Sequence, residues 1–225
     1  MYRRYRENQI IVNRKYQRKL VWTEDEKENL IDSILKGYPI PLIMFAEFVG
    51  SDGKACYEIL DGLQRLNAIV GFIGNEFSWN ERYFDITQIA RDKQAEKEGL
   101  FVGYHGENIL ENEKCANFLD YQLAVTSYKA DDEKQIFEIF GRINSGGRQL
   151  SNQERRQAGI ICDFTNIVRV IAAEIRGDST NELVLLLDMP QISIGSSRIN
   201  ERYGLKAENT FWVKQGILAV QDLRN

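Results

Sequence analysis

The stretch 57–71, YEILDGLQRLNAIVG, decides the fold predicted for this chain. Its first part, up to Leu60, is typical of the end of a buried strand. Asp61-Gly62 is a turn signal, and apolar residues then recur at helical spacing. The order strand, turn and helix places Gln64 and Arg65 on the first helical turn, where unpaired backbone N–H groups and the positive end of the helix dipole favour an anion.

The side chains of this stretch also suit a phosphate. A guanidinium such as that of Arg65 can grip a phosphate with two parallel hydrogen bonds. Asp61 adds a carboxylate that could hold a metal or position a water. Many strand–turn–helix units carry an arginine only for solubility, and the stretch taken alone favours that simpler interpretation.

The flanking sequence predicts a mixed α and β fold. Thr23 and Glu26 form a capping-box pattern that begins a helix ending near Lys36, with Gly37 as its C′ residue. A hairpin turn is expected at 51–54. The remaining expectations are strands over 9–13, 42–49, 55–60 and 118–128, and helices over 66–73, 86–98, 131–142, 164–175, 183–187 and 211–223.

Composition limits the classes of protein to which the chain can belong. It has 225 residues, 43% of them hydrophobic and 28% charged, as in an ordinary globular protein with a sizeable core. No apolar run approaches the ~20 residues of a membrane span, and the basic N-terminus is not followed by the apolar segment of a secretory signal. Three distant cysteines (Cys56, Cys115 and Cys162) favour a reduced cytoplasm and buried, non-catalytic roles. One histidine, His105, cannot build a multi-histidine metal site.

Positive charge is concentrated in two places. Residues 1–20 hold seven Lys or Arg and one Glu, a net charge of +6, so the rest of the chain carries about −10. Such concentration on an acidic protein is a footprint of nucleic-acid binding. For Arg3–Arg6, a solvated tail and a DNA contact are equally open, whereas aromatic residues interleaved with 14–19 favour function there. The residues predicted to contact DNA are Arg14, Lys15, Arg148 and Arg155.

Three arginine-bearing loops follow apolar elements, namely 16–18, 61–65 and 142–147. Together they could enclose a polyphosphate, with Arg65 and Arg142 on phosphate oxygens and Asp61 or Glu58 near a Mg²⁺ ion. Residues 144–147 taken alone are better explained as a helix C-cap and turn. Trp22 and the Phe137/Phe140 stripe are better explained as core residues.

Four linked motifs resemble one known family. YQRKLVW (16–22), LIDSILKGYPIP (30–41), ILDGLQRLNAI (59–69) and FGRINSGGRQLSNQE (140–154) stand in the order found in the ParB-like N-terminal domain of GmrSD modification-dependent restriction enzymes. A related domain occurs in the phosphorothioate-sensing antiphage protein SspE. The resemblance spans roughly residues 10–159.

The resemblance implies a ParB/sulfiredoxin-like α/β core with a small mixed sheet at 1–130. A helical part at 131–225 would follow it and continue into a nuclease domain or partner chain. The family signature D-G-Q-Q-R is associated with nucleoside triphosphate hydrolysis, which implies a nucleotide with Mg²⁺ at Asp61 and catalytic roles for Asp61, Gln64 and Arg65. Leu63 stands where the family usually has Gln, which leaves hydrolysis itself open. The residues implied to bind nucleotide phosphates are Gln17, Arg18, Gly62, Arg65, Arg142, Asn144, Gly146 and Gly147.

Three functions therefore compete. The first is an NTP-hydrolysing sensor domain of a prokaryotic DNA-defence protein. The second is a non-catalytic DNA-binding module that uses the same arginines on DNA phosphates. A nuclease activity of the domain itself ranks last, because the sequence lacks a clear cluster of metal ligands. The nucleotide base, the DNA modification and the oligomeric state are left open.

Overall fold

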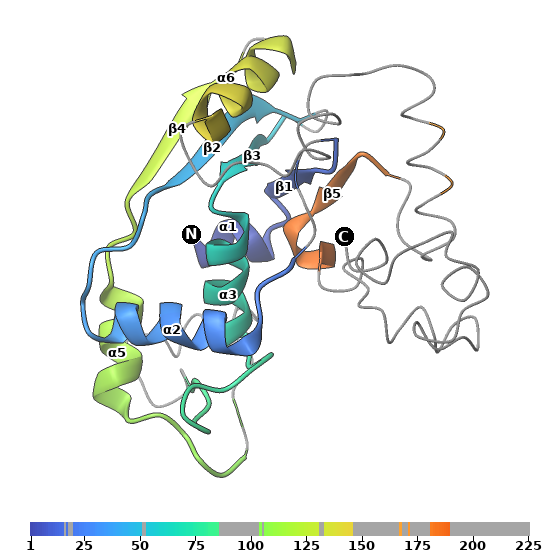
Figure 1. The fold of residues 1–225 in the computed structure, drawn as a ribbon. Helices are drawn as coiled ribbons and strands as arrows, with labels where there is room; N and C mark the ends of the chain where they lie inside the picture. Colours follow the sequence, from blue (N-terminus) through green and yellow to red (C-terminus); the bar gives the residue numbers. More distant parts are fainter. Residues whose placement is uncertain are drawn as a thin grey trace, which may run out of the picture.

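The computed structural model describes residues 1–15, 17, 20–50, 53–85, 104, 106–130, 133–145, 167, 171 and 181–189. Within them, a mixed five-stranded sheet in the order β4-β2-β3-β1-β5 is combined with helices on its two faces (Figure 1). The mixed α and β class predicted from the sequence is confirmed. No helix in the described part of the chain is long and apolar enough to cross a membrane.

The sheet is built around β3 (Ala55–Asp61), which pairs antiparallel with β2 (Ile43–Val49) and parallel with β1 (Ile10–Asn13). β4 (Val125–Lys129) lies parallel to β2 at one edge, and β5 (Leu183–Leu185) lies antiparallel to β1 at the other. The predicted hairpin between β2 and β3 is confirmed, because the Gly50 N–H donates to the Lys54 carbonyl at 2.8 Å.

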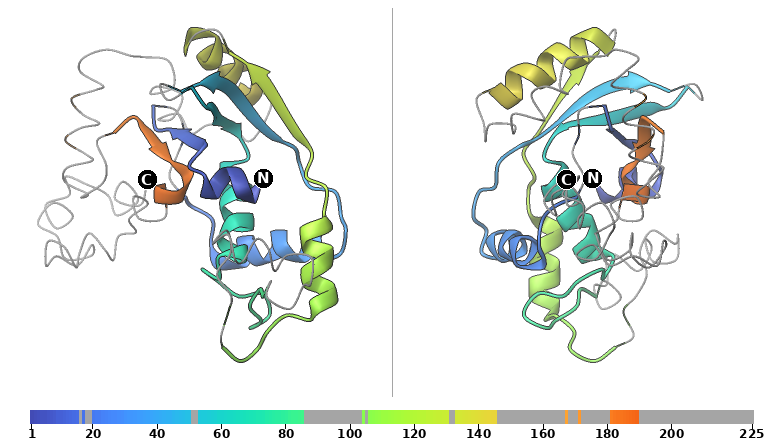
Figure 2. Two further views of the ribbon diagram at one scale, coloured as in Figure 1. Left: turned by 180° about the vertical axis from the view of Figure 1, so that it is seen from behind. Right: turned by 45° about the vertical axis from the view of Figure 1, so that its right-hand side comes forward.

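The helix α3 (Leu63–Ile73) is the centre of the molecule, and ten of its eleven residues are buried. One side of the helix, including Leu66, packs on the sheet together with Phe45 and Ile59. Its other side, including Phe72, packs on α2 (Glu24–Leu35) and α5 (Asn112–Asp120), which lie beside it in both views of Figure 2. A helix with apolar residues on most of its circumference is stable only when it is enclosed in this way.

The helix predicted over residues 131–142 is confirmed as α6 (Glu133–Ser145), and it covers the opposite face of the sheet. Its Ile136 packs against Ala46 and Leu60, whereas Phe45 and Ile59 contact the α3 side. This division follows from the alternation of side chains along a strand. Phe140 is buried as predicted, and the side chain of Phe137 lies outside the described residues.

The N-terminal residues form a helix rather than a solvated tail. In α1 (Tyr2–Arg6), Tyr5 is buried, and the Arg4 guanidinium lies 4.1 Å from the centre of the Tyr57 ring. Two aromatic residues three apart give this five-residue helix an apolar side that packs on the core. At least one of the basic residues therefore has a structural partner.

Two secondary-structure predictions fail in whole or in part. The strand predicted over 118–128 is confirmed only at 125–128, within β4. Residues 118–120 are instead the end of α5, because Cys115 and Phe118 occupy one apolar face of a helix packed against α3. Residues 183–187 form β5 and the start of the 3-10 helix η2 (Leu186–Asp188), because the backbone of Val184 pairs with Val12 of β1. A short apolar run carries no periodicity that distinguishes the two structures.

The helices expected over 86–98 and 211–223 lie outside the described residues, as does nearly all of 164–175. The division into parts at 1–130 and 131–225 remains a prediction. Both α6 and β5, from the second part, pack on the sheet of the first.

Candidate phosphate-binding turn

The candidate site lies where β3 passes into α3. Asp61 is the last residue of the strand, and Gly62 occupies the N-cap position with φ of +93°. A Cβ atom on Gly62 would lie 3.1 Å from Cγ1 of Ile43, so only glycine fits this turn without displacement. The Leu66 N–H donates to the Gly62 carbonyl at 2.8 Å and completes the first turn of the helix. The predicted order of strand, tight turn and helix is confirmed.

The strand is irregular immediately before the turn. Phe45 pairs with Ile59, but Met44 pairs with Asp61, so β3 contains one extra residue at Leu60. In regular strands, consecutive carbonyls point to opposite sides. Here the carbonyls of Ile59 and Leu60 both accept from Nε2 of Gln17, at 2.9 and 3.1 Å. Bulges of this kind often lie next to functional sites, where they redirect a side chain.

Arg65 spans the turn. Its Nη2 donates to Oδ2 of Asp61 at 2.9 Å and to the Leu42 carbonyl at 3.0 Å. The Arg65 side chain is 17% exposed and that of Asp61 is 42% exposed. The Nε–H of Arg65 is buried and has no hydrogen-bond partner among the described residues. The pair therefore holds a partly buried cation at the helix N-terminus while one carboxylate stays open to solvent.

Gln64, predicted to be catalytic, contacts backbone atoms of a neighbouring segment. Its Oε1 accepts from the N–H groups of Val21 and Trp22, at 3.0 and 3.3 Å. The segment 17–22, here called the strap, is thus bonded to both sides of the turn: Gln17 bonds to the strand end, and Val21 and Trp22 bond to the helix start. Trp22 also packs partly against the helical core, as predicted. The sequence alone pointed to both glutamines as ligand contacts and missed these backbone bonds.

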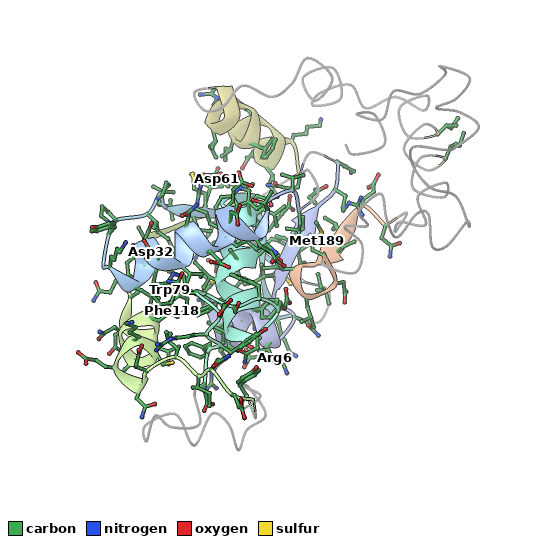
Figure 3. All side chains as sticks on the ribbon, turned by 60° about the horizontal axis from the view of Figure 1, so that its bottom comes forward. Arg6, Asp32, Asp61, Trp79, Phe118 and Met189 are labelled. Carbon is green, nitrogen blue, oxygen red and sulfur yellow. The ribbon has the colours of Figure 1, made fainter. Side chains whose placement is uncertain are left out.

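The third predicted loop begins at the end of α6. Arg142 is 77% exposed on its side chain, and its Nη2 lies 2.5 Å from Oε1 of Glu138. The next residue, Ile143, packs against the cluster that contains Leu60, so the last turn of α6 lies near the residue before Asp61. Figure 3 shows Asp61 on the side of the molecule that carries α6, away from Phe118 and Trp79. The side chain of Asn144 is not among those described, and Arg18, Gly146, Gly147, Arg148 and Arg155 lie outside the described residues.

Lys15, predicted to contact DNA, is tied within the fold. Its Nζ lies 3.1 Å from Oε2 of Glu182, and its side chain is only 16% exposed. The neighbouring Arg14 donates its backbone N–H to the Glu182 carbonyl at 2.7 Å. These contacts fasten the end of β1 to the segment that leads into β5.

Among the described residues, the other reactive or metal-binding side chains do not form a second centre. Glu58, the alternative ligand for Mg²⁺, lies inside β3 and is 3% exposed. Cys115 is fully buried, and burial raises the pKa of its thiol, as expected for a packing residue. Within the described ranges, no group of three or more His, Cys, Asp or Glu side chains could hold a metal.

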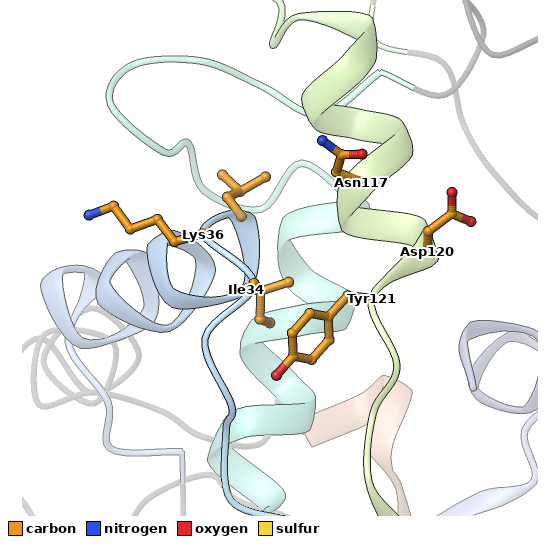
Figure 4. Close-up of a pocket in the computed structure, with 7 residues that line it drawn as sticks. Ile34, Lys36, Asn117, Asp120 and Tyr121 are labelled. Carbon is orange, nitrogen blue, oxygen red and sulfur yellow. The ribbon is translucent and has the colours of Figure 1, made fainter.

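A shallow depression of about 350 Å³ lies between the C-terminal ends of α2 and α5 (Figure 4). Figure 4 shows the Tyr121 ring beside Ile34, and the Tyr121 hydroxyl donates to the Tyr38 carbonyl at 2.7 Å. None of the predicted site residues lines this depression.

The comparisons with known proteins agree with the motif analysis. A family model for the N-terminal domain of GmrSD restriction endonucleases matches residues 2–161, a range that includes the strap, the Asp61–Arg65 turn and α6. No curated protein and no solved structure matches the chain. The match covers more than half of the 225 residues. The chain therefore belongs to the GmrSD restriction endonuclease N-terminal domain family, and it is a module of a restriction system.

Proposed function

We propose that this chain is a nucleotide-binding, NTP-hydrolysing sensor domain of a prokaryotic DNA-defence protein that engages DNA. The observation that carries the proposal is the Asp61–Arg65 pair at the Gly62 turn, in front of the first turn of α3. An arginine, a helix N-terminus and a solvent-accessible carboxylate are the groups that a metal-bound polyphosphate requires.

The turn offers donors for a phosphate. The buried Nε–H of Arg65 has no hydrogen-bond partner among the described residues, and a phosphate oxygen would supply one. The first backbone N–H groups of α3 have no acceptor within a regular helix. Because Gly62 lacks a Cβ atom, the side chains of Ile43 and Arg65 can lie close to the backbone of the turn, which keeps the Arg65 guanidinium beside it.

A single carboxylate such as that of Asp61 is sufficient for a nucleotide-bound magnesium ion. Mg²⁺ bound to nucleotides is commonly held by only one or two carboxylates, with phosphates and waters as its other ligands. Asp61 is 42% exposed, and one of its oxygens is engaged by Arg65, which leaves the other available. When bound, the ion would neutralise charge on the phosphates. Arg65 would stabilise the charge that develops on the transferred group.

Leu63 does not weaken this assignment. Its side chain is 4% exposed and packs with Leu66 and Val70 against the sheet. Position 63 thus faces the apolar core in this chain, on a different side of the helix from Arg65. The replacement of the usual Gln removes no contact that the Asp61–Arg65 pair makes.

The alternative function, a DNA-binding module without nucleotide chemistry, uses the same cations on DNA phosphates. Lys15, Arg65 and Arg142 each have a carboxylate oxygen within 3.1 Å, so their charges are partly compensated. A long-range electrostatic footprint depends on uncompensated charge. We therefore assign Arg65 and Arg142 to the nucleotide. The basic residues Arg14, Arg148 and Arg155 are proposed to contact DNA on the sequence pattern alone, and a C-terminal nuclease domain or partner chain would carry out cleavage.

Phosphate release from ATP, GTP and CTP with Mg²⁺, with and without DNA, tests the proposal. Arg65→Ala and Asp61→Asn should each abolish turnover in a folded protein. Arg82→Ala is the control, because Arg82 also pairs with a carboxylate, but with that of Glu111 and not with Asp61. A wild-type protein that neither binds nor hydrolyses nucleotides, and that binds DNA in a salt-dependent way, would favour the alternative.

A further inference from the structure

The strap is bonded to the candidate site at two points. Nε2 of Gln17 donates to the carbonyl of Leu60, the residue before Asp61. Oε1 of Gln64, the residue before Arg65, accepts from the backbone of the strap at Val21 and Trp22. Both members of the Asp61–Arg65 pair are therefore preceded by a residue that holds the strap.

Gln64 is built into the protein interior. Gln64 is only 8% exposed, and its Oε1 atom accepts hydrogen bonds from two consecutive backbone N–H groups. In this part of the chain, Val21 and Trp22 belong to neither a helix nor a strand, so the side chain replaces the partners that regular secondary structure would provide. An oxygen engaged in this way cannot at the same time accept a hydrogen bond from an attacking water without losing one of these bonds.

We propose that Gln64 is a positioning residue, which docks the strap beside the Asp61–Arg65 turn, and that it does not act by contacting the nucleotide. The inference rests on the proposed nucleotide site for its functional consequence, whereas the docking itself does not. The strap contacts Leu60, the residue before Asp61, and Gln64, the residue before Arg65. Docking would thus affect how the Asp61–Arg65 pair is held for nucleotide binding more than the rate of the chemical step.

The chemistry of the side chain gives a discriminating pair of variants. Gln64→Glu keeps oxygen acceptors for the Val21 and Trp22 N–H groups, and a negative charge at the second position of a helix is favourable. The same variant removes the amide donor and places negative charge beside a phosphate, which would damage a residue that contacts the nucleotide directly. Gln64→Leu has a similar size and removes the acceptor.

Hydrogen exchange of the Val21 and Trp22 amides measures docking without any nucleotide. Gln64→Leu should accelerate exchange at these amides about ten-fold, as expected for the loss of two hydrogen bonds, and Gln64→Glu should leave them protected. Gln122→Leu and Gln122→Glu are the matched controls, because Gln122 is exposed and lies in the segment before β4. Unchanged exchange in Gln64→Leu would overturn the docking role.

Steady-state kinetics then separate positioning from direct contact. Positioning predicts that Gln64→Leu raises KM about ten-fold with a smaller change in kcat, and that Gln64→Glu restores both values. Loss of kcat in Gln64→Glu with protected Val21 and Trp22 amides would overturn the proposal. If Gln64→Leu does not fold, KM and kcat of Gln64→Glu are compared with those of the wild type. Equal values support positioning, and a loss of kcat with protected amides overturns it. A wild-type protein without nucleotide binding would refute the proposed function, and the exchange result would still test the docking.

Discussion

Replacing Gly62 with alanine tests the geometry of the turn on which the candidate site depends. Gly62 has φ of +93°, a conformation in which an L-residue costs roughly 1–2 kcal/mol. In addition, the new Cβ atom would lie 3.1 Å from Cγ1 of Ile43 and 3.3 Å from Nη2 of Arg65. Crowding of this kind in a packed region costs about 1–3 kcal/mol. We therefore expect Gly62→Ala to lower the free energy of unfolding by about 2–5 kcal/mol.

Gly37→Ala separates the two causes. Gly37 also has a positive φ, +70°, but a Cβ atom at this position would have no other atom within 4 Å. This control therefore carries the backbone cost without the crowding, and Gly62→Ala should be more destabilising by about 1–3 kcal/mol. Urea denaturation gives both values, provided that the slope of the transition is unchanged.

The outcome also bears on the site. Because the added methyl group meets Arg65, Gly62→Ala should weaken nucleotide binding even where the protein remains folded. If Gly62→Ala is no more destabilising than Gly37→Ala, Ile43 and Arg65 do not crowd the turn, and the argument that this turn accepts only glycine fails.

Three further predictions concern stability. Thr23→Ala should cost about 1 kcal/mol in urea denaturation, because Thr23 and Glu26 form a reciprocal capping box; a change near zero would contradict the contribution of the cap. Gly141→Ala should stabilise the folded protein by about 0.5–1 kcal/mol and so raise the midpoint of thermal unfolding. Gly141 is exposed in α6, and a Cβ atom at this position would have no other atom within 4 Å. A lower midpoint would refute this prediction. Burial raises the pKa of Tyr5 to about 12, so the folded protein retains the phenol proton above the unfolded-state pKa near 10, and stability should fall as pH rises from about 10 to 12. Tyr5→Phe should show a smaller fall over that range in denaturation curves measured at successive pH values, and an equal fall would contradict the assignment.

The parts of the fold that were predicted correctly have local signals. The capping box at Thr23 and Glu26 marks the start of α2, and Gly37 follows its end with φ of +70°. The turn at Asp61-Gly62 separates a continuous apolar run, typical of a buried strand, from apolar residues that recur at helical spacing. In these segments, neighbouring residues mark where each element begins and ends.

The parts that were predicted wrongly depend on distant partners. Val184 lies in a strand because its backbone pairs with the edge of β1. The run LVLLL, read by itself, does not indicate that this pairing partner exists. α1, a helix that was not predicted from the sequence, is held by the burial of Tyr5 and by the contact of Arg4 with Tyr57, more than fifty residues away in sequence. Tertiary contacts of this kind override local pattern.

The site shows the same division. The sequence placed Asp61, Gly62 and Arg65 at one turn, and the structure confirms that they lie together. It did not indicate that the amides of Gln17 and Gln64 bond to backbone more than forty residues away. Such bonds depend on the bulge at Leu60 and on the path of the strap, and both arise only when the sheet and α3 are assembled.

Calorimetric titration of Mg²⁺-nucleotides into the wild type, Arg65→Ala and Arg65→Lys tests the central claim most directly. Charge-assisted hydrogen bonds to a phosphate predict a loss of affinity of at least about ten-fold in Arg65→Ala. Only part of that loss should be recovered in Arg65→Lys, because an ammonium cannot reproduce the planar fork of a guanidinium. A folded Arg65→Ala protein that binds nucleotide with the affinity of the wild type would show that the Asp61–Arg65 turn is not the nucleotide site.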